Sequence, residues 1–357
     1  MSVEDTMGKA RSKWMEGTGP DNDVVISSRL RLARNIEGYP FPHFMSEEEA
    51  NHVINAVRLA VSEKAGAGFP VETEFVDLNE LSQTERQILV EKHLVSPQHI
   101  ESPANRAVVI AHDESLSIMV NEEDHIRIQC FLPGLQIKEA WRLADKIDDV
   151  LEKTLNYSFC EKRGYLTSCP TNVGTGLRAS VMLHLPCLVM TKQLGAMVNT
   201  ISQLGLAVRG YYGEGTEAYG DLFQVSNQVT MGQTEDEIVT NLLTVTRQIV
   251  SQERSTRKVV LKNNKPFLED RIYRAFGVMS YARVMTSQEA IKNVSDLRLG
   301  VELGILKTPA YDQINELIIL TRPAFLIKKA GHPLNAGELD ALRAEIIREK
   351  LTKININ

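Results

Sequence analysis

The sequence lacks the short patterns that mark several large classes of protein. Its four cysteines form no C-x-x-C pair and no zinc-binding spacing. No apolar run approaches the roughly 18 residues that a membrane-spanning helix needs, and residues 1–13 contain no apolar core of a signal peptide. These absences argue against a zinc module and a membrane protein, and they predict a cytoplasmic protein with free thiols.

The usual phosphate-binding loops are also missing. There is no G-x-x-x-x-G-K-[ST] motif, no H-R-D and no D-F-G, which excludes a P-loop protein and a eukaryotic-type protein kinase. The segment Gly174–Ala179 formally matches the dinucleotide fingerprint, but a strand-like run follows it instead of a helix, and residues 197–200 hold no acid. Any phosphate site must therefore be built from arginine side chains.

Composition is that of an ordinary globular protein. The 357 residues are 43% hydrophobic and 24% charged, which excludes extensive disorder. The formal net charge of −6 argues against a general nucleic-acid surface but not against a local cluster of arginines. A chain of this length predicts one large domain and a smaller one.

Hydrophobic periodicity divides the chain into a mixed part and a helical part. Capping boxes at Ser46–Glu49, Ser82–Glu85 and Thr234–Glu237 predict the starts of three helices, the first of which we expect to end at Gly66. Amphipathic spacing predicts helices over 137–151, 191–204 and 234–253. Apolar runs predict strands at residues 24–26, 108–110, 116–120, 126–131, 179–185, 206–212 and 222–231.

The predicted fold class is α+β, with an antiparallel sheet flanked by helices and an all-helical C-terminal domain. Short turns between the runs from 108 to 131 favour antiparallel pairing. The segment Lys262–Pro266 is interpreted as a connector. Residues 1–257 are therefore predicted to form the main domain and residues 266–357 the helical one.

Five arginines occupy positions within or beside apolar runs. Arg29 and Arg31 follow Ser27 in an extended segment, where alternate side chains point to the same face. Arg127 lies inside an apolar run, where an unpaired charge is costly. Any one of them could be a solvated surface cation, but together they fit a polyphosphate site better. The five are Arg29, Arg31, Arg127, Arg178 and Arg209.

A thiol accompanies these cations. Cys169 stands shortly before Arg178, with Gly174 and Gly176 between them. A thiolate is a useful negative group only where cations lie nearby, and an arginine is a fixed cation that suits phosphate. The ordinary interpretation of this stretch alone is a buried thiol beside a glycine turn.

Two turns carry carboxylates. Glu122, Glu123 and Asp124 form an acidic turn before Arg127, and Glu214 stands between two glycines. Both turns could be solvated loops. Alternatively, carboxylates would grip a guanidinium, whose planar donor fork matches them in bidentate fashion. Because the pKa of a guanidinium lies above about 12, its use as a nucleophile requires acceptors that orient it and take its proton.

Taken together, these segments resemble the phosphagen (guanidino) kinase family. The resemblance extends from about residue 20 to about residue 255. It implies a catalytic domain with an antiparallel sheet flanked by helices, and transfer of phosphate from ATP, accompanied by Mg²⁺, to a guanidino group. The matching stretches, in the family's order, are Ile26–Arg31, Asn121–Arg127, Cys169–Ser180, Arg209–Gly215 and Val225–Asn227.

The same resemblance implies roles for individual residues. Glu123 and Glu214 would clamp the substrate guanidinium, with Glu123 as the catalytic base. Cys169, as a thiolate, would lie against a non-reacting guanidinium nitrogen, and the loop from Glu214 to Gly220 would close over the substrate. No metal ligand from the protein is implied. ATP would be held by Ser27, Arg29, Arg31, Arg127, Arg178 and Arg209.

Departures from the animal enzymes point to a bacterial branch of the family. Few residues precede Arg29, which predicts loss of the helical cover that recognises free guanidino compounds, and a helical C-terminal region is added. Met182 stands where a histidine near the adenine is expected, so the adenine contacts must differ. This arrangement resembles the protein-arginine kinases, which phosphorylate arginine side chains of proteins.

Members of that branch carry an Arg-Asp-x-x-Arg-Ala phosphoarginine pocket. The corresponding stretch here is Leu339–Ala344, whose first residue is not an arginine. Asp340 and Arg343 are candidate remnants of the pocket, and an ordinary capped helix explains them equally well. The C-terminal domain would accordingly serve dimerisation or recognition of phosphoarginine.

The main hypothesis is ATP-dependent phosphorylation of arginines in proteins, marking them for a stress response and degradation. One alternative is a kinase for free arginine or another small guanidino compound, and another is a non-catalytic adaptor that reads phosphoarginine. The resemblance implies as partners protein substrates with exposed arginines, a small zinc-binding activator, a Clp-type unfoldase, a heat-shock repressor and a second copy in a homodimer. Neither nucleic acid nor a membrane is expected as a partner.

Overall fold

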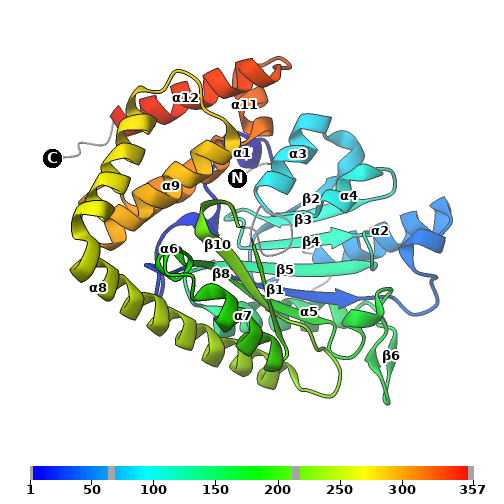
Figure 1. The fold of residues 1–357 in the computed structure, drawn as a ribbon. Helices are drawn as coiled ribbons and strands as arrows, with labels where there is room; N and C mark the ends of the chain where they lie inside the picture. The colour runs from blue at the N-terminus through cyan, green and yellow to red at the C-terminus, as the bar shows by residue number, and fades with distance from the viewer. Residues whose placement is uncertain (1–2, 63–68, 211–217, 353–357) are drawn as a thin grey trace.

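The computed structural model describes residues 3–62, 69–210 and 218–352. Its centre is an eight-stranded sheet in which neighbouring strands all run antiparallel (Figure 1). The order across the sheet is β2-β3-β4-β5-β1-β8-β10-β9. The strands are β1 (Val25–Arg34), β2 (Thr73–Asp77), β3 (Ala107–Ala111), β4 (Leu116–Val120), β5 (Ile126–Pro133), β8 (Leu177–His184), β9 (Leu206–Gly210) and β10 (Leu222–Asn227).

The register of β1 decides which side chains become neighbours. This ten-residue strand lies between β5 and β8, so it is paired on both sides. Arg29 lies opposite Ser180 and Arg31 opposite Arg178 on β8, while Ala33 lies opposite Arg127 on β5. Because residues two apart on a strand share a face, this register gathers cations from three strands onto one face of the sheet.

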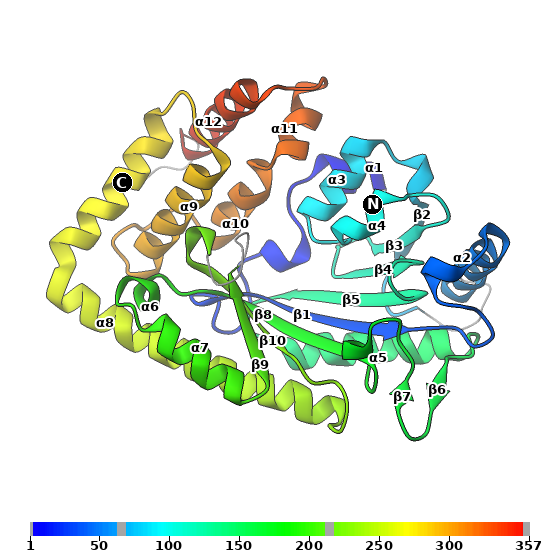
Figure 2. The same ribbon diagram turned by 45° about the vertical axis from the view of Figure 1, so that its right-hand side comes forward.

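One face of the sheet is covered by helices that bury a large apolar core. Figure 2 shows α5 (Ile137–Glu152) and the first part of α8 (Glu235–Tyr281) packed along this face. Both α5 and α2 (Glu47–Val61) are amphipathic, and their apolar side chains meet Leu30 and Leu32 of β1 in the core. Two further helices, α6 (Pro186–Met190) and α7 (Leu194–Gln203), follow β8 in the chain.

The opposite face is covered only in part. α1 (Val3–Gly8), α3 (Gln83–Glu91) and α4 (Pro97–Glu101) lie over β2, β3 and β4 on this side. A second core cluster forms here from both ends of the chain. Its members include Trp14, Ile88, Leu89, Val108, Met119, Phe131, Met182, Ile319 and Phe325. The last two come from the C-terminal region, so this region packs directly on the sheet.

The C-terminal region is helical, as predicted. It contains α9 (Ser287–Glu302), α10 (Tyr311–Leu320), α11 (Pro323–Ala330) and α12 (Ala336–Thr352). These helices pack with the second part of α8 around a third core cluster that includes Leu268, Leu297, Leu317 and Ile347. The division into domains at residues 257 and 266 stays a prediction.

The connector expected at Lys262–Pro266 is a kink within α8 and not a loop. The helix expected to end near Glu253 continues to Tyr281, with one kink where Asn264 has φ −136° and ψ 33°. Pro266 cannot donate the backbone hydrogen bond of a helix interior, which accounts for a kink at this point. Val260 and Leu268, on either side of the kink, are both buried in the third cluster. Tertiary packing therefore holds the helix together where local sequence favours a break.

The predicted strands and capping boxes are confirmed. Every run predicted as a strand overlaps a strand, and the capping boxes at Ser46, Ser82 and Thr234 all form. The proposed helix end at Gly66 lies outside the described residues. The sequence reading missed the edge strand β2 and the small hairpin of β6 (Phe159–Cys160) and β7 (Gly164–Tyr165). Among the described helices, none combines the length and apolar character needed to cross a bilayer.

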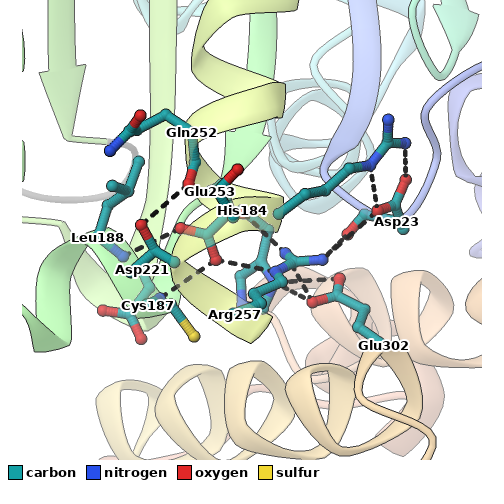
Figure 3. Close-up of polar contacts among 12 residues, drawn as sticks. Asp23, His184, Cys187, Leu188, Asp221, Gln252, Glu253, Arg257 and Glu302 are labelled. Carbon is teal, nitrogen blue, oxygen red and sulfur yellow. Dashed lines mark hydrogen bonds and ion pairs between the residues drawn. The ribbon is translucent and has the colours of Figure 1, made fainter. Parts of the chain in front are cut away.

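A buried network of charges joins the sheet to the C-terminal helices. Figure 3 shows Glu302 of α9 facing His184, the last residue of β8, and Arg257 of α8. One Glu302 oxygen lies 3.2 Å from His184 Nδ1 and 2.7 Å from Arg298 Nε, and the other lies 2.9 Å from Arg257 Nη2. Glu302 is fully buried. Its carboxylate therefore balances two arginines that are themselves buried.

We expect Glu302→Gln to lower the free energy of unfolding by about 3–5 kcal/mol, because it leaves the buried Arg298, whose other acceptors are neutral, without a counter-charge. The measurement is urea unfolding of the whole chain. The matched control is Glu349→Gln, whose exposed pair with Lys329 should contribute about 0–1 kcal/mol. Equal unfolding curves for the two variants would contradict a central role for Glu302.

Candidate active site

Most of the residues singled out in the sequence meet in one cavity of about 210 Å³. It opens on the sheet face opposite α5 and is lined by side chains from β1, β5, β8, β9 and β10. A carboxylate and a thiol stand among several guanidinium groups. Its charged and thiol-bearing lining consists of Arg31, Glu123, Arg127, Cys169, Arg178 and Arg209.

Arg178 is held in place by three acceptors. Its Nε donates to Asn172 Oδ1, its Nη1 to the carbonyl of Asn227 and its Nη2 to Thr171 Oγ1, each at 3.1 Å. All three bonds leave the positive charge uncompensated, because none of the acceptors is a carboxylate. The guanidinium is therefore oriented in advance for an anion.

Asn227 explains part of this order. Its Oδ1 accepts the backbone N–H of Ala179 at 2.8 Å, and its Nδ2 donates to the carbonyls of Leu177 and Val229 at 3.0 Å. The amide thus ties the end of β10 to the start of β8, on either side of Arg178. The resemblance to the phosphagen kinases includes Val225–Asn227 but implies no role for Asn227.

Arg31 has a buried nitrogen without a hydrogen-bond acceptor: within the described part of the chain, its Nε has no hydrogen-bond partner. Burial, together with the positive charges of Arg29, Arg127 and Arg178, holds the pKa of Arg31 well below its usual value. Buried polar groups normally find a partner, so this nitrogen is available to donate to a bound anion.

Arg29 lies in a neighbouring cavity of about 590 Å³, which shares Arg31 and Arg127 with the first. Its Nη2 donates to Gln224 Oε1 at 2.8 Å, and its guanidinium carbon lies 5.4 Å from the centre of the Phe131 ring. We call the first cavity the transfer cavity and this larger one the outer cavity. They meet at Arg31 and Arg127.

Ser27 is buried in β1 and lines neither cavity. It lies opposite Met182 in the register, and Met182 is itself buried in the second core cluster. The methionine thus fills the sheet face at the position where a histidine was expected.

The three carboxylates of the acidic turn make different contacts. Asn121 begins the turn with a positive φ of 61°, and its N–H bonds the carbonyl of His125 at 2.9 Å. Glu122 accepts from Ser96 Oγ at 2.6 Å and from Arg127 Nη1 at 2.5 Å. It therefore anchors the turn and partly balances the charge of Arg127.

Asp124 joins this turn to the segment that carries the thiol. Its Oδ1 accepts from Asn35 Nδ2 and from the backbone N–H of Ser168, both at 2.7 Å. Ser168 directly precedes Cys169, so the bond brings the thiol beside the turn. His125 braces the other side: its Nδ1 accepts from the N–H of Ile36 at 2.9 Å, so Nε2 carries the proton and donates to the Pro40 carbonyl at 2.8 Å.

Glu123 is the one member of the turn that reaches the transfer cavity. It remains exposed there and shares the lining of this cavity with Cys169. Partial burial, together with the negative charges of Asp124 and Glu122, raises the pKa of Glu123 above its usual value. Cys169 Sγ also lies 3.0 Å from Thr171 Oγ1.

The glycines after Cys169 are required by the backbone conformation. Gly174 has φ +113°, and an added Cβ would stand 2.3 Å from the carbonyl oxygen of Thr230. Gly176 has φ +65°, and its Cβ would stand 2.6 Å from the carbonyl oxygen of Ala33. Only glycine permits both the positive φ and the close approach. These two glycines let the segment after Cys169 pass close to Thr230 and to Ala33 of β1. This role in the backbone fits the rejection of a dinucleotide loop.

Asp340 and Arg343 line neither of these cavities. Glu214 lies outside the described residues. Arg343 is 2% exposed in α12, where it forms an ion pair with Asp340 and donates to the carbonyls of Thr321 and Met285, both at 2.8 Å. Arg343 is therefore bonded to groups of the protein itself, with Asp340 as its ion-pair partner. No group of three or more His, Cys, Asp or Glu side chains suited to a metal occurs among the residues that the structure describes.

The site is thus an arginine-lined cavity that holds a carboxylate and a thiol, on an antiparallel sheet. The model of the ATP:guanido phosphotransferase C-terminal catalytic domain matches residues 50–256. Among solved structures, a lombricine kinase aligns with a TM-score of 0.58 at 23% identity, over 71% of this chain and 75% of that chain. The duplicated taurocyamine kinase of Schistosoma mansoni aligns with a TM-score of 0.57 at 25% identity, over 81% of this chain and 44% of that chain.

Whole-length relatives identify the branch. The protein-arginine kinase of Desulforamulus reducens is 56% identical over 355 residues, which is 99% of each chain. That of Pelotomaculum thermopropionicum is 52% identical over 356 residues and covers both chains completely. The model of the protein-arginine kinase McsB C-terminal domain matches residues 265–357. The chain is therefore a phosphotransferase and belongs to the protein-arginine kinase family.

Replacing Glu123 should remove turnover without disturbing the fold. A general base contributes a factor of about 10² to 10⁴, so we expect Glu123→Gln to lower kcat by that range. Its thermal midpoint should stay that of the wild type, because Glu123 is exposed and anchors nothing. The matched control is Glu139→Gln, an exposed acid of α5 whose kcat should be unchanged. Full turnover by Glu123→Gln would rule out its role as base.

The raised pKa of Glu123 also predicts a pH dependence. A base acts in its ionised form, so kcat/KM should fall as pH falls through the pKa of Glu123. Because burial and its acidic neighbours raise that pKa, the acidic limb should lie above pH 4.5, the ordinary value for a glutamate. The measurement is a kcat/KM profile against pH for the wild type. A limb centred at or below pH 4.5 would assign the acidic limb to another group.

Proposed function

We propose that this protein transfers the γ-phosphoryl group of ATP to a guanidinium nitrogen of arginine side chains in proteins. The observation that carries the proposal is the meeting of four arginines with Glu123 and Cys169 in one cavity. Guanidinium groups match phosphate oxygens in bidentate fashion, whereas a carboxylate and a thiolate suit a cationic acceptor. The cavity thus offers complementary partners for both reactants.

The arginines hold the nucleotide. Arg31, with its unpartnered Nε, and the oriented Arg178 face the phosphate oxygens, and Arg127 and Arg209 complete the cationic wall. Arg29 and Ser27 belong to the same proposed nucleotide site, on the side of the outer cavity. Mg²⁺ would arrive with ATP, held mainly by phosphates and water, and would neutralise charge on the triphosphate. Phosphoryl transfer depends largely on such positioning and charge neutralisation.

Glu123 receives the proton that the acceptor must lose. The guanidinium nitrogen forms a bond to the γ-phosphorus as the bond from that phosphorus to the ADP oxygen breaks, and the displaced proton passes to the Glu123 carboxylate. A raised pKa makes this carboxylate a better proton acceptor. Cys169, which lines the same cavity as Glu123, would lie against a nitrogen that does not react. Glu214, the second predicted clamp, belongs to the proposal through the family motif alone.

A protein chain is the proposed acceptor because the whole-length relatives are named protein-arginine kinases. The finer predictions belong to the same proposal: a cytoplasmic homodimer that marks proteins for a stress response and degradation. The four cysteines, Cys130, Cys160, Cys169 and Cys187, are unpaired, which supports a reducing compartment. The zinc-binding activator, the Clp-type unfoldase, the heat-shock repressor and the Asp340–Arg343 phosphoarginine pocket rest on family resemblance.

Direct product analysis tests this function. The enzyme is incubated with MgATP and either an unfolded arginine-rich protein or free arginine, and the products are analysed by mass spectrometry without acid, because the phosphorus–nitrogen bond is acid-labile. We expect phosphate on arginine side chains of the protein and a far lower rate on free arginine. Phosphorylated free arginine as the main product would make this a small-guanidine kinase. ATP consumption absent from both reactions would favour the adaptor hypothesis.

A further inference from the structure

The wall of the outer cavity crosses from the catalytic sheet to the C-terminal helices. Alongside Arg29, Arg31 and Arg127, it is lined by Arg322 and Pro323, which stand at the start of α11. Arg322 belongs to none of the segments that carry the family resemblance in the catalytic domain. We propose that Arg322 is a further phosphate-binding residue of the nucleotide site, so that the C-terminal region completes this site.

The catalytic domain fixes the start of α11 by a carboxylate. Glu91, the last residue of α3, accepts the backbone N–H groups of Ala324 at 2.9 Å and of Phe325 at 3.3 Å. A carboxylate bound to the exposed N–H groups of a helix start is a strong anchor. Lys328 of α11 adds an ion pair with Glu85 of α3 at 2.8 Å. In Figures 1 and 2, α11 lies beside α3 accordingly.

The C-terminal helices fix the same point from the other side. Arg343 of α12 donates to the carbonyl of Thr321 at 2.8 Å, and Thr321 Oγ1 donates to the carbonyl of Leu317 at 2.7 Å. Arg322, between Thr321 and Pro323, therefore has its backbone held by both parts of the protein. The Arg343 contact that occupies the predicted phosphoarginine remnant thus positions the neighbour of Arg322.

The charges around the outer cavity favour a polyanion. Four arginines and one carboxylate, that of Glu91, line it. Glu91 is already bonded to the start of α11, and Glu122 balances only Arg127, in part. Arg322 lies close enough to His93, on the same wall, for its charge to act there: burial, then the charges of Arg29 and Arg322, lower the pKa of His93 to about 3. His93 is therefore neutral at physiological pH and adds no competing charge.

A triphosphate bound at Arg31 and Arg127 faces Glu123 on the transfer side and Arg322 on the outer side. Arg322 would accordingly contribute to binding ATP and not to the chemical step, since it does not line the transfer cavity. The inference rests on the proposed function only for the identity of the nucleotide. Its consequence is that nucleotide affinity depends on how the C-terminal helices are docked.

The test measures binding to the full-length protein by calorimetry, with MgATP, inorganic tripolyphosphate and adenosine as probes. We expect Arg322→Gln to weaken MgATP and tripolyphosphate by about tenfold each, the effect of losing one charge-assisted contact. Arg322→Lys should lie between Arg322→Gln and the wild type, and adenosine binding should not change. The matched control is Lys329→Gln, an exposed cation of the same helix, which should bind all probes as the wild type does.

Wild-type affinity of Arg322→Gln for MgATP and tripolyphosphate would overturn the inference. Equal losses in the glutamine and lysine variants, or an equal loss for adenosine, would also overturn it, because they would indicate packing and not charge. In steady state, Arg322→Gln should raise the KM for ATP with kcat little changed. Binding needs no acceptor, so a wild type that binds ATP yet phosphorylates no arginine would refute the proposed function and leave this inference standing.

Discussion

Repulsion among like charges is the constraint around which this protein is built. The register of β1 places Arg31 opposite Arg178 on β8 and Ala33 opposite Arg127 on β5. Such a cluster is costly in a folded protein, and here it is only partly balanced, by Glu122 on Arg127. Neutral acceptors orient Arg178 without cancelling its charge. The unpartnered Nε of Arg31 completes a surface that a polyanion stabilises.

The acidic turn shows how one short segment can meet opposing demands. Glu122 and Asp124 hold the structure of the turn. Glu122 accepts from Ser96 and Arg127, and Asp124 accepts from Asn35 and from the backbone of Ser168, next to Cys169. Their charges nonetheless help to raise the pKa of Glu123 between them. The same two carboxylates that hold the turn in place therefore also make Glu123, the proposed base, more basic.

The C-terminal region is joined to the catalytic part and not simply appended to it. The helix α8 runs through the expected connector, the buried Glu302 network links α9 to the end of β8 (Figure 3), and Phe325 enters a core shared with the sheet. Changes in the docking of these helices would reach the sheet through contacts that are fully desolvated. The placement of Arg322 on the wall of the outer cavity belongs to the same pattern.

Sequence alone determined the class of fold, the starts of the capped helices and the set of arginines, carboxylates and thiol, because caps, periodicity and residue chemistry act locally. It could not show that Glu122 and Asp124 are structural while Glu123 faces the cavity, nor that Asn227 and Arg322 belong beside the site. It also placed a break at Pro266, where packing of Val260 and Leu268 sustains the helix. These outcomes were decided by tertiary structure, since each depends on contacts between residues far apart in the chain, whose energies no local pattern records.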